Sequence, residues 1–527
     1  MRSDIIKVYK DVHIWVGILS GLALFVAFYA GAITMFEKPL ERWATPPDQL
    51  PAPIALERAP ELIAATLAMH PEAAASYQIR TTVTPDQPGR LVWQIRGERR
   101  GEQTEYAAAL DADGHLQVVQ TYKTQVAESV DVLHQQVGLP FEHEVAMPIM
   151  GVIALLYAVA LISGVIVLLP TLIKDLFALR IGKNLKRLWL DVHNALGIFS
   201  LPFHIVMALT AVVFAFHDQF YDVQEAVVYP QKIEWAADPP EPRPADAQVL
   251  PPHVLIERVN AQAPHFQVLA VGYSERKGQL TARVEGLDPR YGMRGRISTQ
   301  VGVNPYTGQL HRDDLPGELP GWETAVASFF SLHFGNFGGN GIRWAYFLLG
   351  LGGAVLFYTG NVLWLESRRS KQRHHETLSQ SRSSRILASL TVGVSFGCIA
   401  GTSATIAAAK WLPAWLDAAA AEQWHSGIYY TVFLAAVAWS LLRGGARAAS
   451  EVPLAAAIAC VLIPLSSVAG IRRWGGAWPS TGSAIWVDVI AMIGAVLLVW
   501  IARRARDRGL NGPRDSVWSF AARASAG

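Results

Sequence analysis

The stretch DVHIWVGILS, residues 11–20, returns as DVHNALGIFS at residues 191–200. Six of the ten positions are identical, and each copy places a histidine, His13 or His193, at the start of a long apolar run. Self-similarity of this kind indicates a repeated structural unit. We therefore predict two matched halves, each of which opens with a histidine-bearing helix.

The composition of the chain is that of a membrane protein. Of its 527 residues, 51% are hydrophobic and only 17% are charged, whereas a soluble globular chain usually has roughly 25% charged residues. The net charge is +2, and no basic tract suggests a nucleic-acid partner. The two cysteines, Cys398 and Cys460, lie in separate apolar runs, so the sequence has no disulfide framework and no paired-cysteine metal site.

Eight apolar segments approach the roughly 20 residues that a membrane-spanning helix needs. They are residues 14–36, 145–173, 194–216, 344–365, 386–409, 425–442, 452–471 and 484–502. Basic residues cluster before the first segment and after the second, fourth, sixth and eighth, which places both termini in the cytoplasm by the positive-inside rule. We expect the first segment to be an uncleaved signal-anchor.

This topology predicts a polytopic α-helical protein with two exported domains. The helices of the core are assigned to residues 1–36, 145–173, 194–216 and 342–366, and four further helices to 386–502. The predicted cytoplasmic parts are residues 174–193, 367–385 and 503–527. Residues 37–144 and 217–341 are predicted to be two α+β domains, because each combines a Pro-rich linker, a helical pattern and alternating strand patterns.

Further histidines fit the repeat. His134 in VLHQQVGLP and His333 in SLHFGNFGG precede the second helix of each half. His204 follows His193 by eleven residues; in one continuous helix the two rings would share a face, about 16 Å apart along the axis. Pro202 lies between them and could kink that helix.

Paired histidines in apolar spans favour a haem protein. An ionisable ring inside a span is a functional hypothesis by default, and a b-type haem needs two facing imidazoles and an apolar slot. Histidines at a membrane interface can also simply reach the headgroups. A zinc or copper site would cluster its ligands more tightly, and a proton relay would recruit acidic residues, of which Asp488 is the main one within a span.

The first 370 or so residues resemble the PepSY-associated transmembrane family of bacterial inner-membrane proteins. The likeness is carried by DVHIWVGILSGLALFVAFYAGAITMF, DVHNALGIFSLPFHIVMALTAVVFAF and LHFGNFGGNGIRWAYFLLGLGGAVLFYTGNVLWLE. The turn VNPYTGQL, residues 303–310, looks like the end of a PepSY-type domain. After His134 the sequence has one glycine where the family pattern is Gly-rich, and the last four spans are not covered by the smaller reductases of the family.

The resemblance implies a haem-binding four-helix core with periplasmic PepSY-like domains. Members include ferric-siderophore reductases that pass electrons through two bis-histidine b haems. By position, His13 and His193 would hold the inner haem, and His333 would hold the outer one with either His134 or His204.

We therefore expect a di-haem oxidoreductase in the lipid bilayer of the bacterial inner membrane. It would take electrons from quinol or a reduced flavin carrier and reduce a ferric siderophore or another ferric chelate. Ferrous iron would then be released, because hard oxygen donors bind it weakly. Two alternatives are a haem-free PepSY module that senses a ligand or regulates a peptidase, and a siderophore transporter, which would show broken helices.

Overall fold

The computed structural model describes residues 3–46, 50–84, 87, 89–96, 103–121, 124–175, 185–227, 248–276, 279–293, 299–319, 321–373, 380–473 and 482–520. The chain divides into two compact units. A helical unit contains residues 1–45, 124–222 and 343–527, and a sheet unit contains residues 46–123 and 223–342.

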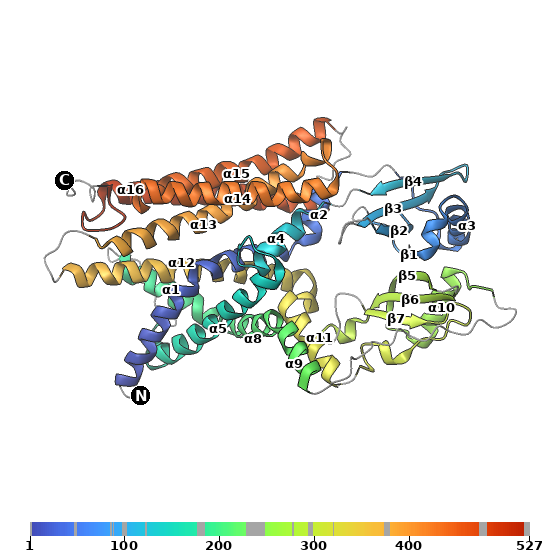
Figure 1. The fold of residues 1–527 in the computed structure, drawn as a ribbon, viewed down its shortest axis with the longest axis horizontal. Coiled ribbons are helices and arrows are strands. Elements are labelled where there is room, and N and C mark those ends of the chain that lie inside the picture. The colour runs from blue at the N-terminus through green and yellow to red at the C-terminus, as the bar shows by residue number, and fades with distance from the viewer. Residues whose placement is uncertain are drawn as a thin grey trace. The chain divides into compact units, whose positions relative to one another are not determined.

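Long apolar helices dominate the helical unit (Figure 1). In the described part of the chain, seven helices are long and apolar enough to cross a membrane, or eight spans when one bent pair is counted as a single span. The helices are α1 (Ser3–Thr34), α2 (Glu37–Ala44), α4 (Val126–Gln135), α5 (His143–Leu168), α6 (Leu172–Asp175), α7 (Leu185–Phe199), α8 (Leu201–Ala215), α9 (His217–Val227), α12 (Gly339–Arg373), α13 (Arg382–Ala409), α14 (Ala418–Arg443), α15 (Gly445–Arg473) and α16 (Ile485–Asn511).

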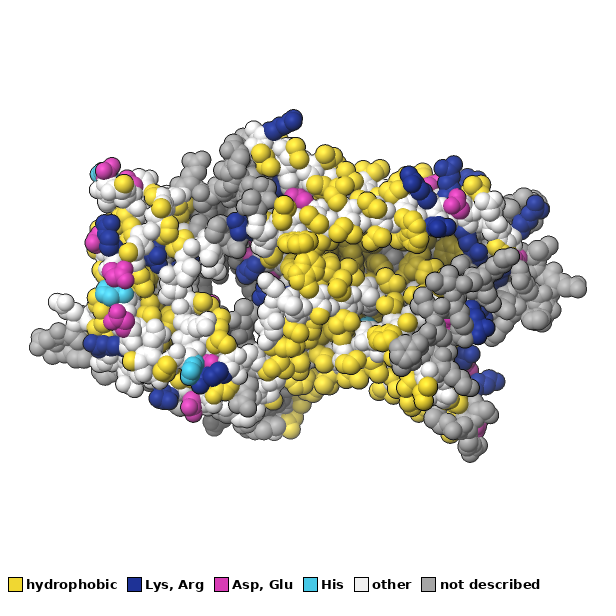
Figure 2. All heavy atoms as spheres, turned by 180° about the vertical axis from the view of Figure 1, so that it is seen from behind, with side chains coloured by type: hydrophobic (Ala, Val, Ile, Leu, Met, Phe, Trp, Pro, Cys, Tyr) yellow, Lys and Arg dark blue, Asp and Glu magenta, His cyan; other side chains and the backbone are white. Residues whose placement is uncertain are grey.

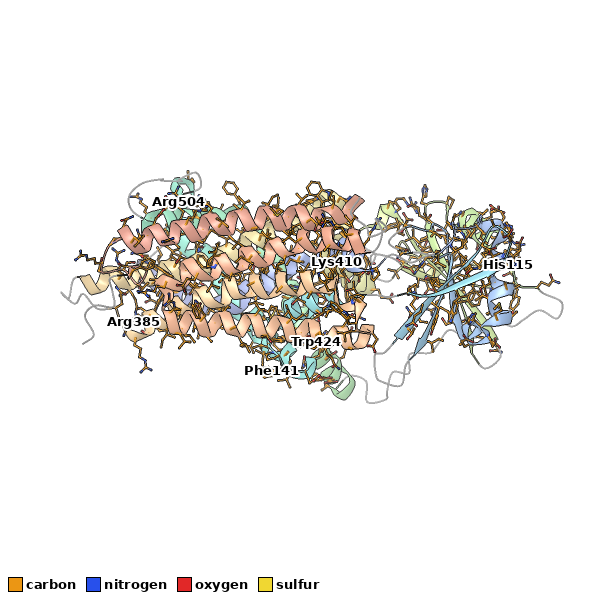
Figure 3. All side chains as sticks on the ribbon, turned by 90° about the horizontal axis from the view of Figure 1, so that it is seen from above. His115, Phe141, Arg385, Lys410, Trp424 and Arg504 are labelled. Carbon is orange, nitrogen blue, oxygen red and sulfur yellow. The ribbon has the colours of Figure 1, made fainter. Side chains whose placement is uncertain are left out.

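The surface of this unit matches a bilayer. Hydrophobic side chains gather over the helices (Figure 2), and Ile458 of α15 and Val496 of α16 are among those exposed. Arg385 and Arg504 lie at one end of the helices, and Trp424 lies toward the other end (Figure 3). Because exposed apolar surface on this scale needs lipid around it, the chain is a multi-pass membrane protein, as the composition predicts.

The third predicted span differs from the expected continuous helix. α7 and α8 meet at Ser200 with a bend of 70°. Pro202 lies in the first turn of α8 and has no N–H to donate to the preceding turn, which explains the break. The single-axis spacing of about 16 Å between His193 and His204 therefore does not apply.

A polar cluster ties α2 to the C-terminal helices. The indole N–H of Trp43 lies 3.0 Å from both Ser467 Oγ and Asp488 Oδ1. The ammonium group of Lys410 lies 4.1 Å from the centre of the Trp43 ring and donates to Ser467 Oγ at 2.9 Å. Ser467 also donates to Asp488 at 2.9 Å. The acidic residue within the last span is therefore hydrogen-bonded to Trp43 and Ser467, as a structural residue in a membrane span needs to be.

One seven-stranded antiparallel sheet forms the second unit. Its order is β4-β3-β2-β1-β5-β6-β7. The strands are β1 (Ser76–Arg80), β2 (Leu91–Arg96), β3 (Gln103–Leu110), β4 (Leu116–Thr121), β5 (Gln267–Arg276), β6 (Gln279–Leu287) and β7 (Thr299–Val303), and the helices are α3 (Ala59–Met69), α10 (Pro252–Gln262) and α11 (Gly321–Phe334).

Strand alternation separates the two faces of the sheet. Ile79 of β1 and Val271 of β5 are fully buried in a core with Leu62 of α3 and Leu255 of α10. Gln78 lies between two buried residues of β1 and therefore points to the opposite face. The apolar positions thus bury one face under α3 and α10 and leave polar side chains on the other.

The expectation of two separate outer domains needs correction. Each long connection supplies its own helix and strands, as predicted, but the halves share one sheet. β1 and β5 pair antiparallel over five residues, from Ser76 opposite Ser274 to Arg80 opposite Ala270. The physical reason is that each half alone would expose the backbone of an edge strand, and pairing satisfies both edges at once.

Several boundaries also differ from the prediction. α4 was expected in the first outer domain but belongs to the helical unit, where Val126, Val130 and Leu133 are buried. α7 begins at Leu185, inside the predicted loop 174–193, and α12 continues to Arg373. The second Pro-rich linker, residues 238–246, lies outside the described residues.

The joint sheet predicts a specific disulfide. Cysteines at Ser76 and Ser274 should cross-link on mild oxidation, because directly opposed strand residues lie about 4.5–5.5 Å apart between Cα atoms. The matched control is the double variant Ser76→Cys and Thr281→Cys, because Thr281 lies on β6, one strand beyond the β5 strand that pairs with β1. Mass spectrometry of linked peptides reads out the bond, and a cross-link in neither pair would contradict the shared sheet.

Candidate functional site

The first histidines of the two repeats meet inside the helical unit. The rings of His13 on α1 and His193 on α7 have centroids 6.2 Å apart and planes inclined by 75°. A metal atom between two imidazoles, with metal–nitrogen bonds of about 2 Å and roughly 1 Å from each nitrogen to its ring centre, needs a separation of about 6 Å. The separation of the two rings would therefore accommodate one metal ion held by both imidazoles.

A hydrogen bond to a helix carbonyl orients each of these rings. His13 Nδ1 donates to the carbonyl of Ala160 on α5 at 2.8 Å. His193 Nδ1 lies 3.2 Å from the carbonyl of Leu356 and 3.0 Å from Thr359 Oγ1, both on α12. A carbonyl only accepts, so the proton sits on Nδ1 and the lone pair on Nε2, which is the arrangement that metal-binding histidines use.

Glycines one turn later on the same helices make room for the rings. A Cβ atom added at Gly164, four residues after Ala160, would lie 2.9 Å from His13 Cε1. One added at Gly360, four residues after Leu356, would lie 3.7 Å from His193 Cε1. The two rings are thus seated by the same two-residue arrangement, a carbonyl and then a glycine, although contact is much tighter at Gly164.

His134 repeats this arrangement on a third helix pair. Its Nδ1 donates to the carbonyl of Ala27 on α1 at 2.8 Å, and a Cβ atom at Gly31 would lie 2.7 Å from its ring. The glycine that makes room for His134 is therefore Gly31 on α1, four residues after Ala27, and not a residue that follows His134. Sequence reasoning that looked for a Gly-rich segment after His134 missed it.

His204 on α8 is fully buried and has one nitrogen without a partner. Its Nδ1 lies 2.6 Å from the hydroxyl of Tyr157, which also lies 3.2 Å from the carbonyl of His204. Tyr157 can donate to that carbonyl and accept from Nδ1–H. Nε2 then carries the free lone pair, and it has no hydrogen-bond partner among the described residues.

Aromatic side chains surround the His204 ring. The ring centres of Phe28, Phe203 and Phe357 lie 5.6, 5.7 and 6.5 Å from that of His204. A lone buried acceptor in such a pocket costs about 1–3 kcal/mol unless a ligand binds it. Neutral imidazoles with a free ring nitrogen, set among apolar side chains, are the ligand set that a b-type haem uses.

His333 lies on α11, which belongs to the sheet unit. Its ring stands edge-on to Phe334, with ring centres 5.5 Å apart. The helical unit brings His13 and His193 together, whereas the choice of His134 or His204 as the partner of His333 stays a prediction.

In the described residues, the one cluster with close metal-ligand spacing is Asp111, Asp113 and His115, where Asp111 already accepts from backbone N–H groups of its own turn.

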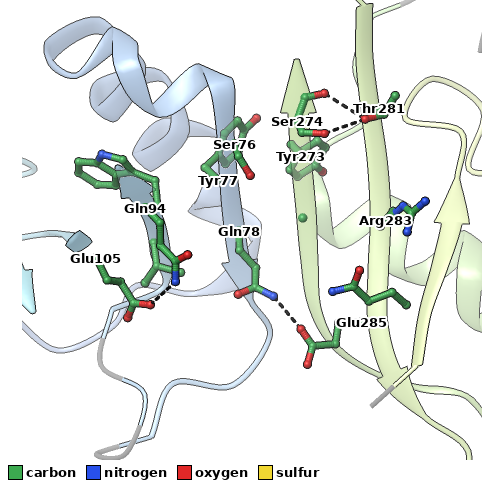
Figure 4. A pocket seen from close by; sticks show the side chains of 14 residues that line it. Ser76, Tyr77, Gln78, Gln94, Glu105, Tyr273, Ser274, Thr281, Arg283 and Glu285 are labelled. Atoms are coloured by element: carbon green, nitrogen blue, oxygen red, sulfur yellow. Dashed lines mark hydrogen bonds between the residues drawn. The ribbon is translucent and has the colours of Figure 1, made fainter. Parts of the chain in front are cut away.

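The open face of the sheet holds a polar pocket at the junction of the two halves. It has a volume of about 340 Å³ and is lined from β1, β2, β3, β5, β6 and β7 (Figure 4). Gln78 donates to Glu285 at 2.9 Å, and Gln94 donates to Glu105 at 3.1 Å. The exposed guanidinium of Arg283 lines the same pocket.

Burial shapes the titration of the groups around this pocket. It raises the pKa of the Tyr77 phenol to about 12, so this hydroxyl keeps its proton at neutral pH. Burial also lowers the pKa of Arg80, although Glu105, 3.6 Å away, favours its charged form. The pocket therefore offers cations, carboxylates and neutral donors together.

The family model that matches this chain covers the repeated helices and the sheet and ends before α13. The model of the family described as the PepSY-associated TM region matches residues 11–367 of this chain. The chain is also 24% identical over 398 residues to an uncharacterized protein of Pseudomonas aeruginosa, which covers 71% of this chain and 94% of that protein. α13 to α16 lie beyond the matched region. Because the match covers more than half of the chain, the protein belongs to the PepSY-associated TM region family.

Proposed function

We propose that the protein is a di-haem electron-transfer protein of the bacterial inner membrane that reduces a ferric chelate, such as a ferric siderophore. The observation that carries the proposal is the 6.2 Å spacing of the His13 and His193 rings, each held by a backbone carbonyl and a glycine. His134 and His204 supply the same kind of imidazole elsewhere in the unit.

The residues divide the task between holding and insulating a cofactor. A bound haem would supply reversible one-electron chemistry, and His13 and His193 would hold it through Nε2. Ala160 and Leu356 fix the ring orientation through their carbonyls. Phe28 and the other aromatic rings around His204 keep water away from a second site, which lowers the reorganisation that accompanies electron transfer.

The sheet pocket is the proposed seat of the ferric chelate. It lies where the two halves of the outer segments pair, and it combines Arg283 with the carboxylates of Glu105 and Glu285 and with amide donors. Chelates that wrap ferric iron present carbonyl and charged oxygen atoms, which guanidinium and amide groups recognise. Reduction to ferrous iron weakens the hard oxygen ligands and favours release.

The proposed topology places the chelate site in the periplasm and both termini in the cytoplasm. Basic clusters at the same ends of successive spans support it. Electrons would come from the cytoplasmic side or from the quinol pool.

Transporters also have broken membrane helices, but at the break between α7 and α8 the backbone hydrogen bonds are largely kept. The N–H of Ser200 donates to the carbonyl of Leu196 at 3.1 Å, and the N–H of His204 donates to the carbonyl of Ser200 at 2.9 Å. Transporters instead use unwound backbone at the midplane to bind substrate. The bend therefore favours positioning of His193 and His204 over substrate binding.

Removing either member of the facing histidine pair should remove one and the same haem. The purified wild-type protein should carry two low-spin b haems, and His13→Ala, His193→Ala and the double variant should each keep one. Haem per chain and the dithionite-reduced spectrum measure this. His217→Ala, at an exposed position, is the control. A colourless wild type would end the haem proposal, and a double variant without any haem would show that the two rings serve different haems.

Filling the glycine beside His13 should act like removing the histidine. A side chain at Gly164 meets the ring at 2.9 Å, so Gly164→Val should displace His13 and lose that haem, at about 1–3 kcal/mol of strain. Gly17→Val is the matched control, because nothing lies within 4 Å of its added Cβ. Full haem occupancy in Gly164→Val would contradict the role of the glycine.

The pocket assignment predicts a substrate effect without a haem effect. Arg283→Gln should raise KM for ferric-chelate reduction by about tenfold, the loss expected for one charge-assisted hydrogen bond. Haem content should stay at two. Arg290→Gln is the control, because Arg290 pairs with Asp288 outside the pocket lining. An unchanged KM in Arg283→Gln would move the chelate to another surface.

A further inference from the structure

A buried histidine of the C-terminal bundle lies outside the residues that the family model matches. His425 on α14 is 1% exposed. Neither Nδ1 nor Nε2 has a hydrogen-bond partner among the described residues. Two unmade hydrogen bonds on one buried ring cost about 1–3 kcal/mol each. An apolar side chain would avoid this cost, so the ring at this position points to a ligand.

Other buried polar groups line the same helix interface. Tyr429 follows His425 by one turn on α14, and Thr402 lies on α13; both hydroxyls are buried without an oxygen or nitrogen partner in the described part of the chain. The Cys398 thiol lies beside both. Thr405 Oγ1 lies 3.4 Å from the carbonyl of His425, which shows that the two helices are in contact here.

Close packing explains why these groups face one another. Gly393, Gly397 and Gly401 recur every fourth residue on α13 and form one face of that helix. A Cβ atom added at Gly401 would lie 3.0 Å from the Tyr429 ring. The glycine face therefore draws α14 against α13 and brings His425 and Tyr429 to the polar positions of α13.

The chemistry of this interface selects a neutral, lipid-soluble ligand. Residues 386–409 of α13 and 423–442 of α14 contain no Asp, Glu, Lys or Arg. α14 also faces lipid, since Trp424 and Leu434 are 57% and 58% exposed (Figure 3). A ligand from the bilayer that can bond to a neutral imidazole and to hydroxyls carries exchangeable O–H or carbonyl groups on an apolar body.

The interface also lies next to one of the candidate haem ligands. Tyr429 packs in one cluster with Val130 and Leu133 of α4 and with Ala30 of α1. His134 follows Leu133 directly. A ligand between His425 and Tyr429 would therefore lie one helix away from a cofactor held by His134, which is a position suited to an electron donor.

We infer that His425, Tyr429 and Thr402 form a binding site for a membrane quinol, which is the electron donor of the protein. The inference rests on the proposed function and names its donor. A His425 ring nitrogen accepts from one quinol hydroxyl, while the hydroxyls of Tyr429 and Thr402 bond to the quinol oxygens.

The oxidation balances in electrons and protons. Each quinol loses two O–H protons and two electrons and becomes a quinone. The two electrons would account for the reduction of two ferric ions to ferrous ions in the proposed reaction. The His425 imidazole takes the proton of the hydroxyl that it bonds to, and the proton of the second hydroxyl is released to solvent as the quinone leaves.

The test compares two reductants on the full-length, haem-loaded protein. Anaerobic reduction is followed optically with tetramethylbenzoquinol and, separately, with dithionite. In His425→Phe, the rate with quinol should fall by about 100-fold, the usual effect of losing a general base, while the dithionite spectrum and the two haems per chain are unchanged. Tyr429→Phe should slow the quinol reaction and keep the ring packing. His143→Phe, at an exposed position on α5, should match the wild type.

The outcomes separate this inference from the proposed function. A His425→Phe protein that quinol reduces at the wild-type rate overturns the quinol site, as does a variant that has lost one haem, since His425 would then be a haem ligand. A wild type with two haems that dithionite reduces and quinol does not overturns the inference alone. A colourless wild type overturns the proposed function. If His425→Phe does not fold, His425→Gln and Tyr429→Phe provide the same test.

Discussion

The organisation of the helical core depends on one contact, a histidine Nδ1–H donated to a helix carbonyl with a glycine one turn further on. It occurs for His13, His193 and His134, on three different helices. In an apolar bilayer interior, an imidazole without this bond would be unpaired and free to rotate. The bond fixes the tautomer, and the glycine lets the ring approach the neighbouring backbone, so Nε2 is aimed in a defined direction before any ligand binds.

The same principle of satisfying polar groups organises the sheet unit. Two membrane spans separate the outer segments in the sequence, yet β1 of the first pairs with β5 of the second over five residues. The pairing covers one edge of each half, and β4 and β7 remain the edge strands of the joint sheet. The pairing also creates the pocket, because side chains from both halves meet on the open face around Gln78 and Glu285. The duplicated unit thereby has a pocket whose lining comes from both copies.

The C-terminal helices show two different treatments of polar groups in the membrane. At Trp43, Lys410, Ser467 and Asp488, charges and donors neutralise one another and attach α2 to the bundle. At His425, the ring nitrogens have no such partners among the described residues. The first arrangement is what a structural joint requires. The second arrangement leaves the ring nitrogens of His425 able to bond to a ligand.

The sequence by itself determined the membrane class, the spans, the internal repeat and the histidines, because hydrophobic length and repeated motifs are local properties. It also indicated a helix and alternating strand segments in each outer connection. Only the tertiary structure decided that those segments share one sheet, that the third span bends by 70° at Ser200, and that His13 faces His193 at 6.2 Å. Strand pairing, bend angle and ring orientation depend on contacts between residues far apart in the chain, and local pattern carries no information about which distant partner satisfies a given backbone or ring.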